Sequence, residues 1–201
     1  MMPYRHKLIP GHLYHIYNRG VEYRPIFTRD QHWIFWTRRF VEYLEGKGRL
    51  LAYCLMPNHF HLLVEVGCAD FGNEVMKPFG SSYVNAFNRQ ERRVGPLYQN
   101  RFQSKWVDTD DYLLTLSRYI HMNPVWAGLV RSPSAWPHSS YQDYVSGEAR
   151  PWLHTEPVFA AFERQGFWPR GSLSREDAYV RYVTRPRYGP EQWEDWWVEE
   201  S

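Results

Sequence analysis

The sequence of 201 residues lacks three features that define large classes of proteins. No apolar run approaches the roughly 20 residues that a helix needs to cross a bilayer. The first residues carry no apolar stretch of the kind found in a secretory signal. Cysteine occurs only twice, at Cys54 and Cys68, without the spacing of a disulfide framework. We therefore expect a cytoplasmic protein in a reducing setting, with no membrane partner.

A large excess of charge is also absent, because the formal net charge is only +2. The charges are unevenly spread, however, with +7 over residues 1–107 and −5 over residues 108–201. A basic half suits a polyanion such as nucleic acid, and arginine, which outnumbers lysine, suits bidentate phosphate contacts. Aromatic residues make up 18% of the chain, and those outside the core can stack on unpaired bases. Charge alone does not distinguish this reading from an ordinary solvated surface.

Hydrophobic periodicity predicts an alternation of strands and helices. Strands are predicted at residues 12–19, 50–56, 59–66 and 102–107, and helices at about residues 28–45, 76–93 and 108–123. We expect Thr28 or Asp30 to cap the first helix, Pro78 to start or kink the second, and Pro124 to end the third. The order of these elements matches the ferredoxin-like pattern of two split βαβ halves. The predicted fold class is therefore α+β, with a central antiparallel sheet backed by helices.

The amino-acid composition changes near residue 132, where prolines become frequent. Two short helices are predicted near residues 157–165 and 175–183, the second opened by a capping-box sequence at Ser174. We assign residues 1–145 to a first domain and residues 146–201 to a mostly helical C-terminal extension rich in tryptophan and proline. The sequence does not decide whether the tryptophans near its end pack on the domain, form a partner surface or fray.

The most informative stretch is a turn at Pro57 and Asn58 that runs into the strand at residues 59–66. Side chains alternate across a strand, so His59 and His61 share one face while Phe60 points to the other. Two imidazoles in neighbouring same-face positions can hold one metal ion. The simpler alternative is a pair of half-exposed histidines on an edge strand, because a bare His-x-His pattern is common by chance.

A second segment far along the chain favours the metal interpretation. If residues 118–124 form a helix, Tyr119 and Asn123 lie one turn apart on a single face. Two histidines and an amide oxygen around a metal, with a tyrosine hydroxyl beside it, form a recognisable chemical unit.

Four segments, at residues 14–20, 54–65, 98–102 and 118–125, together resemble the REP-associated tyrosine transposases, within the single-tyrosine His-hydrophobic-His (HUH) transposase and endonuclease family. The resemblance covers roughly residues 10–145 and keeps the motifs in order. It departs from the family at Asn100, where relatives often have glycine, and at Trp126, where they often have arginine. Lys77 and Pro78 also interrupt a helix that is usually continuous in the family.

The resemblance implies metal-dependent cutting and rejoining of single-stranded DNA at hairpin-forming repeats, through a 5′-phosphotyrosine intermediate. It makes Tyr119, on a catalytic third helix, the nucleophile. His59, His61 and Asn123 become ligands of a divalent metal, Mg²⁺ or Mn²⁺, although imidazoles alone suit Zn²⁺ or Mn²⁺ better. The expected partner is single-stranded or hairpin DNA, and the protein would be a monomer or homodimer.

Several further residues have candidate roles around this site. We expect a group of basic side chains to contact DNA phosphates, with a solvated basic face as an equal alternative: Arg89, Arg92, Arg93, Arg101 and Lys105. A core position is favoured for His15 over a place in the site, and a structural role for His121. Glu65 is interpreted as a solvated acid at a strand end and Tyr112 as a packing residue.

Two other functions remain compatible with the sequence. One is a non-catalytic, ferredoxin-like nucleic-acid-binding protein, against which the intact set of His59, His61, Tyr119 and Asn123 argues. The other is a zinc hydrolase that uses water as its nucleophile and would tolerate Tyr119→Phe.

Overall fold

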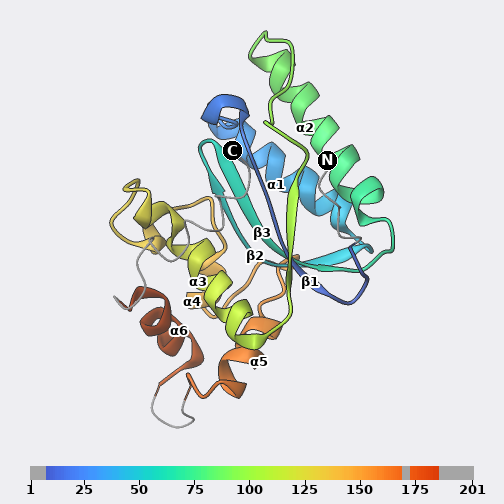
Figure 1. Ribbon diagram of the computed structural model, residues 1–201. Helices are drawn as coiled ribbons and strands as arrows, with labels where there is room; N and C mark the ends of the chain where they lie inside the picture. The colour runs from blue at the N-terminus through green and yellow to red at the C-terminus, as the bar shows by residue number, and fades with distance from the viewer. Residues whose placement is uncertain (1–7, 169–172, 186–201) are drawn as a thin grey trace.

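The structure, a computed structural model, describes residues 8–168 and 173–185. At its centre lies an antiparallel sheet of four strands in the order β2-β3-β1-β4 (Figure 1). The strands are β1 (Leu13–Arg19), β2 (Gly48–Met56), β3 (His59–Val66) and β4 (Gln103–Val107). Three longer helices are α1 (Asp30–Leu44), α2 (Lys77–Gln90) and α3 (Asp110–Trp126). Three shorter ones are α4 (Tyr141–Val145), α5 (Glu156–Arg164) and α6 (Arg175–Thr184).

The strand order confirms the predicted ferredoxin-like arrangement. The units β1-α1-β2 and β3-α2-β4 interleave, so that β1 and β3 become the two central strands. The β2–β3 hairpin turns at Pro57 and Asn58, as predicted, and Met56 pairs with His59 directly after the turn. Central strands are held by hydrogen bonds on both sides, so side chains on β1 and β3 have the most rigid positions that the sheet offers.

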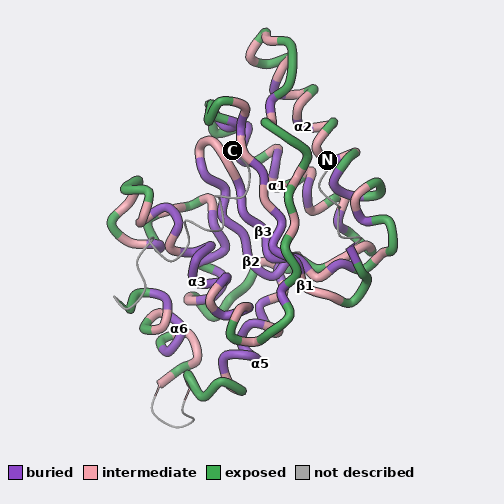
Figure 2. Tube along the Cα trace, in the orientation of Figure 1, coloured by how far each residue is buried: buried purple, intermediate pink, exposed green. Residues whose placement is uncertain are grey.

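Helices cover both faces of the sheet. On one face Phe60 packs against Trp36 of α1, with ring centroids 4.9 Å apart, and Trp36 packs against Phe79 of α2. On the other face α3 lies over β2 and β3, where Tyr119 meets His61. Figure 2 shows that β2 and β3 are buried along most of their length between these layers. The alternation predicted for residues 59–66 therefore matches the two covered faces.

The shorter C-terminal helices pack beside α3, and α4 also reaches the edge of the sheet, where the Tyr144 hydroxyl donates to the carbonyl oxygen of Leu51 at 2.7 Å. α5 and α6 contact α3, and α4 contacts α6. The buried Arg118 of α3 donates from Nε to the carbonyl oxygen of Val183 at 2.9 Å, near the end of α6. The boundary between the first domain and the C-terminal extension, at residues 145 and 146, stays a prediction. The tryptophans near the end of the chain, at 193, 196 and 197, lie outside the described residues. No helix in the described part combines the length and apolarity needed to span a membrane.

Two helix boundaries differ from the sequence predictions. The residue before α1 is Arg29, with no side-chain cap, because the hydroxyl of Thr28 donates to Glu91 at 3.1 Å instead. α3 continues past Pro124 to Trp126. The proline removes one helical N–H, but the helical hydrogen bonds resume after it, since Ala127 donates to the carbonyl oxygen of Asn123 at 2.9 Å. The predicted role of Pro78 is confirmed, since it lies in the first turn of α2, directly after a π-helical turn (Gly72–Met76).

Candidate active site

β3 presents the two histidines toward α3. The rings of His59 and His61 lie 5.1 Å apart between centroids and nearly perpendicular, and the intervening Phe60 packs on the opposite side of the sheet. His61 is buried and His59 is partly exposed at the end of the strand. The pair therefore forms a short row that begins at the hairpin turn and runs inward.

α3 places one side chain against each histidine. The Tyr119 hydroxyl lies 3.5 Å from Nε2 of His61, and Oδ1 of Asn123 lies 3.3 Å from Nε2 of His59. One helical turn rises about 5.4 Å and two strand residues span about 6.6 Å, so residues four apart on α3 match residues two apart on β3. Thr109 fixes the start of the helix, because its hydroxyl accepts the backbone N–H of Tyr112 at 3.2 Å. All four predicted site residues come together.

Both histidines are held in the neutral form. Burial lowers the pKa of His59 to about 4, although its contact with Asn123 acts in the opposite direction. Burial also lowers the pKa of His61 well below its usual value, and the neighbouring His59 and His15 add to the effect. A neutral imidazole has a free lone pair, which is the form that binds a metal ion.

The donor set fits a divalent metal that is completed by other ligands. Within residues 8–168 and 173–185, no group of three or more histidine, cysteine or acidic side chains is arranged so that it could hold a metal ion by itself. The candidate donors are instead two neutral imidazoles and one amide oxygen, at His59, His61 and Asn123. Such an uncharged set leaves the positive charge of an ion available to anionic ligands such as phosphate.

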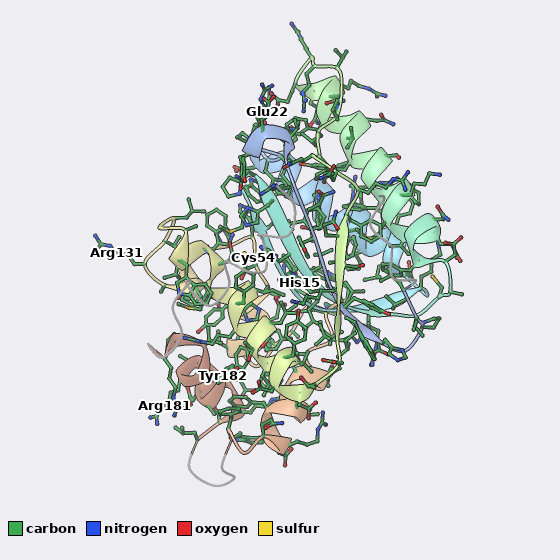
Figure 3. The ribbon with its side chains drawn as sticks, in the orientation of Figure 1. His15, Glu22, Cys54, Arg131, Arg181 and Tyr182 are labelled. Atoms are coloured by element: carbon green, nitrogen blue, oxygen red, sulfur yellow. The ribbon has the colours of Figure 1, made fainter. Side chains whose placement is uncertain are left out.

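His15 extends the site to a third histidine. It lies on β1, and its Nε2 is 2.9 Å from Nδ1 of His61. Figure 3 labels His15 in the interior of the molecule, where it is 2% exposed. Burial, together with the charge of Lys105, lowers the pKa of His15 to about 3. His15 is thus a buried histidine, as expected, but it also contacts a candidate metal ligand.

A comparison with known protein families matches the part of the chain that forms this site. The family described as IS200-like transposases matches residues 10–123, more than half of the chain and the whole of the site from β1 to Asn123. The chain belongs to the IS200-like transposase family.

Two individual proteins are also similar. A Haemophilus influenzae protein, named as a candidate REP-associated tyrosine transposase, is 28% identical over 111 residues, which are 50% of this chain and 63% of the relative. The chain thus spans less than two thirds of that relative. A structure described as a REP-associated tyrosine transposase bound to a REP hairpin superimposes with a TM-score of 0.59 at 21% identity. It covers 79% of this chain and 93% of its own, which shows that the fold is shared.

One residue of this IS200-like chain was missed by sequence reasoning. Arg19 pairs with His59 across β1 and β3, and directly opposed residues share one face of a sheet. Its charge also lowers the pKa of His59. The guanidinium is fixed by Nε, which donates to Gln99 at 2.6 Å, and by Nη1, which donates to the Tyr23 hydroxyl at 2.9 Å. The predicted ferredoxin-like fold was the signal that could have found Arg19. In that fold β1 lies beside β3, which brings the residues of β1 next to the histidines.

The structure does not gather the predicted basic residues at the site. Lys105 lies opposite His15 in the sheet and therefore on the histidine face. Arg101 lines a cavity on the other side of the sheet. The remaining three, Arg89, Arg92 and Arg93, lie at or beyond the last turn of α2, the upper end of that helix in Figure 1. Their contact with DNA stays a prediction.

The other singled-out residues occupy ordinary structural positions. Glu65 forms an ion pair with Arg49 at the end of the hairpin. His121 points away from Tyr119 into a buried contact, with Nδ1 2.9 Å from the Tyr179 hydroxyl and Nε2 2.8 Å from the Ser140 hydroxyl. Tyr112 packs within reach of the Lys105 ammonium, which lies 5.7 Å from its ring centroid.

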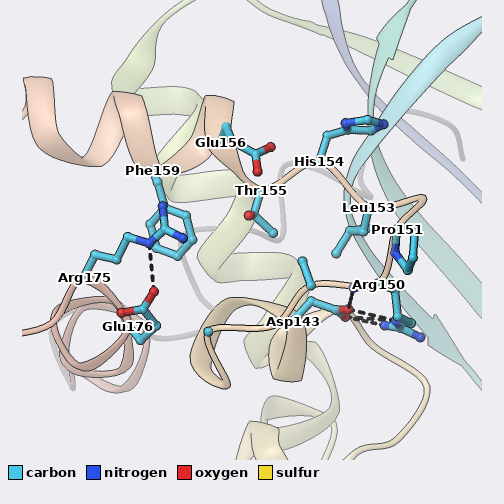
Figure 4. A pocket seen from close by; sticks show the side chains of 12 residues that line it. Asp143, Arg150, Pro151, Leu153, His154, Thr155, Glu156, Phe159, Arg175 and Glu176 are labelled. Atoms are coloured by element: carbon cyan, nitrogen blue, oxygen red, sulfur yellow. Dashed lines mark hydrogen bonds and ion pairs between the residues drawn. The ribbon is translucent and has the colours of Figure 1, made fainter.

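A polar cavity of about 330 Å³ lies apart from this site, among α4, α5 and α6 (Figure 4). Four of its five acidic and arginine side chains form two ion pairs, Arg150 with Asp143 and Arg175 with Glu176 at 2.8 Å, and Glu156 is the fifth. These internal pairs leave little net charge to attract a ligand, so the cavity does not compete with the histidine cluster as a candidate active site.

Proposed function

We propose that this chain cleaves and rejoins single-stranded DNA at hairpin-forming repeats, with Tyr119 as the nucleophile. The observation that supports the proposal is the convergence of Tyr119 and Asn123 from α3 on His61 and His59 from β3. The family to which the chain belongs is a transposase family, and the hairpin substrate is suggested by the structural relative that is described with a REP hairpin.

In the proposed reaction the Tyr119 phenol loses its proton, and its oxygen attacks the scissile phosphorus and forms a phosphotyrosine bond to the 5′ phosphate of the fragment downstream of the break. The bond from phosphorus to the 3′ oxygen breaks, and that oxygen takes up a proton to leave as a 3′ hydroxyl. Reversal with another 3′ hydroxyl rejoins the strand without an external energy source, because the phosphodiester bond energy is kept in the protein–DNA link.

The residues of the site have different roles in this proposed reaction. A divalent ion, Mg²⁺ or Mn²⁺, on His59, His61 and Asn123 would supply positive charge to the phosphate oxygens and favour the ionised phenol. Arg19, fixed beside His59, is placed to bind a phosphate oxygen of the same strand. Nε2 of His15 contacts Nδ1 of His61 and so holds the His61 ring, which leaves Nε2 of His61 directed toward Tyr119.

A cleavage assay tests this function. Labelled hairpin DNA taken from beside the gene is incubated with the protein and Mg²⁺ or Mn²⁺, and the products are separated on a denaturing gel. We expect cleavage that is lost with a chelator and in Tyr119→Phe. Cleavage that survives the substitution would favour a hydrolase that uses water. Binding without cleavage in either metal would favour the non-catalytic nucleic-acid-binding alternative.

A further inference from the structure

A cavity of about 630 Å³ lies on the face of the sheet opposite the histidines. One wall is formed by the π-helical turn and α2, and the other by the segment that precedes β4, residues 98–102. Figure 1 shows this segment descending beside α2 before β4 begins. The volume falls within the range of roughly 300–1,000 Å³ that holds small organic ligands. We call this cavity the α2 groove.

The α2 groove combines an aromatic wall with a polar rim. Tyr98 and Phe102 contribute rings, and Tyr98 is fixed because its hydroxyl accepts a hydrogen bond from Trp36 Nε1 at 3.2 Å. Exposed Asn85 and Asn100 add side-chain amides, each with both donors and an acceptor. This is the combination by which proteins hold an unpaired base, with the ring faces for stacking and the amides for the base edge.

The charge of the α2 groove suits a phosphate backbone. Two exposed cations line it, Lys77 and Arg101, and none of its fifteen lining residues, all within the described part of the chain, is acidic. The groove is open beside Gly80, where an added Cβ would meet no atom within 4 Å, so only a larger side chain at this position would enter it. An elongated anion with flat apolar parts therefore fits its chemistry better than a neutral or cationic ligand does.

A polar path joins the α2 groove to the candidate active site. Asn18 and Phe60, which line the groove, pair with each other in the sheet, and the neighbouring pair on the opposite face is Arg19 with His59. Arg19 then reaches Gln99, the residue before Asn100 and Arg101. The backbone of Asn100 is held to β1 by a hydrogen bond from Asn18 at 3.0 Å. The two sites thus lie back to back across the sheet and share one rim.

We propose that the α2 groove binds an unpaired nucleotide of the DNA strand, which passes around residues 99–101 from the active site. This inference rests on the proposed function, because it takes single-stranded DNA as the occupant. The base lies against Phe102 and Tyr98, and the adjoining phosphate lies near Arg101. The groove would add affinity for the flanking strand without taking part in the bond exchange.

Binding of a fluorescein-labelled oligothymidine, followed by fluorescence anisotropy in the presence of a chelator, tests the inference on the full chain. Gly80→Leu fills the groove and should weaken binding about tenfold, because the displaced base loses its stacking contact. Gly80→Ala is the matched control: it makes the same change in helix propensity but leaves the groove open, so its affinity should equal that of the wild type. Phe102→Ala should lose a similar factor and Phe102→Trp should retain the affinity.

The outcomes separate the groove from the catalytic proposal. Equal affinities of the wild type, Gly80→Leu and Phe102→Ala would overturn the inference even if the wild type cleaves hairpin DNA, and so would a wild type with no affinity for oligothymidine. A tenfold loss in Gly80→Leu but not in Gly80→Ala would support it even if the wild type cleaves nothing. Thermal melting of each variant checks folding, and Gly80→Leu carries the test if Phe102→Ala unfolds.

Discussion

At the scale of single residues, the contact between His15 and His61 sets which nitrogen of His61 faces the active site. One of the two nitrogens that meet at 2.9 Å must carry the proton. If His61 binds a metal through Nε2, its Nδ1 carries a proton and donates it to Nε2 of His15. His15 is then a positioning residue, which fixes the tautomer and orientation of a ligand without touching the metal.

Replacing His15 therefore tests the arrangement of the ligands. His15→Leu removes the acceptor and should weaken Mn²⁺ binding by about 10–100-fold, the usual effect of losing such an outer partner. His15→Gln places an amide oxygen near the former Nε2 and should retain most of the affinity. Free Mn²⁺ is measured by electron paramagnetic resonance. Equal affinities of His15→Leu and the wild type would show that the contact does not support the metal site.

Arg19 gives a second prediction at this scale. Arg19→Gln removes a charge beside His59 and should lower the rate of DNA cleavage by about 10–100-fold, since a hydrogen bond to a charged group is worth roughly 1.5–3 kcal/mol. Arg24→Gln removes an equal charge from an exposed side chain nearby and should leave the rate almost unchanged. Similar rates for the two variants in single-turnover cleavage would contradict a phosphate contact at Arg19.

At the scale of elements, the site depends on the register between α3 and β3. The N-cap at Thr109 helps to set where α3 begins, and with it the heights of Tyr119 and Asn123 over the histidines. Thr109→Ala should lower the free energy of unfolding by about 1 kcal/mol, while Thr109→Ser should restore it. Urea denaturation measures both. No loss in Thr109→Ala would show that the remaining contacts of α3 fix its start.

The elements were predictable where their signals are local. Alternation alone placed His59 and His61 on one face, and helical spacing alone placed Tyr119 and Asn123 on another, so the four candidate residues were found without the structure. Thr28 was misread as a cap because its hydroxyl is engaged by Glu91, more than sixty residues away. Contacts of that range leave no pattern in the sequence around them.

The same limit explains why Arg19 was missed and why His15 was expected in the core without its contact to His61. Both residues reach the site only because β1 lies next to β3 in the sheet, a neighbour relation between segments far apart in the sequence. Pro124 was expected to end its helix from a local rule, but α3 continues for two residues, because the backbone N–H of Ala127 still finds a helical acceptor at Asn123.

At the scale of the whole molecule, several histidines are buried in neutral form, and this makes stability depend on pH. His121 joins α3 to α6 and to Ser140, and burial lowers its pKa from 6.5 to about 3. Between these values the unfolded chain binds a proton that the folded chain does not. The stabilising contribution is therefore complete above about pH 6.5 and is lost as the pH falls toward 3.

We expect the metal-free protein to lose about 2 kcal/mol of unfolding free energy through His121 alone between about pH 7 and pH 5, since each unit of pKa difference is worth 1.36 kcal/mol. Urea titrations at a series of pH values in the presence of a chelator measure the slope. His121→Gln cannot titrate there and should show a shallower dependence. An unchanged slope in that variant would mean that His121 does not carry this linkage.

The covalent link between Tyr119 and DNA is the central claim, and mass spectrometry of the trapped product tests it most directly. The protein is incubated with hairpin DNA and Mn²⁺, digested with nuclease and protease, and its peptides are sequenced. The account predicts a nucleotide attached through a 5′ phosphate to the peptide that contains Tyr119, and no adduct in Tyr119→Phe. Cleaved DNA without any adduct, or an adduct on a different residue, would contradict it.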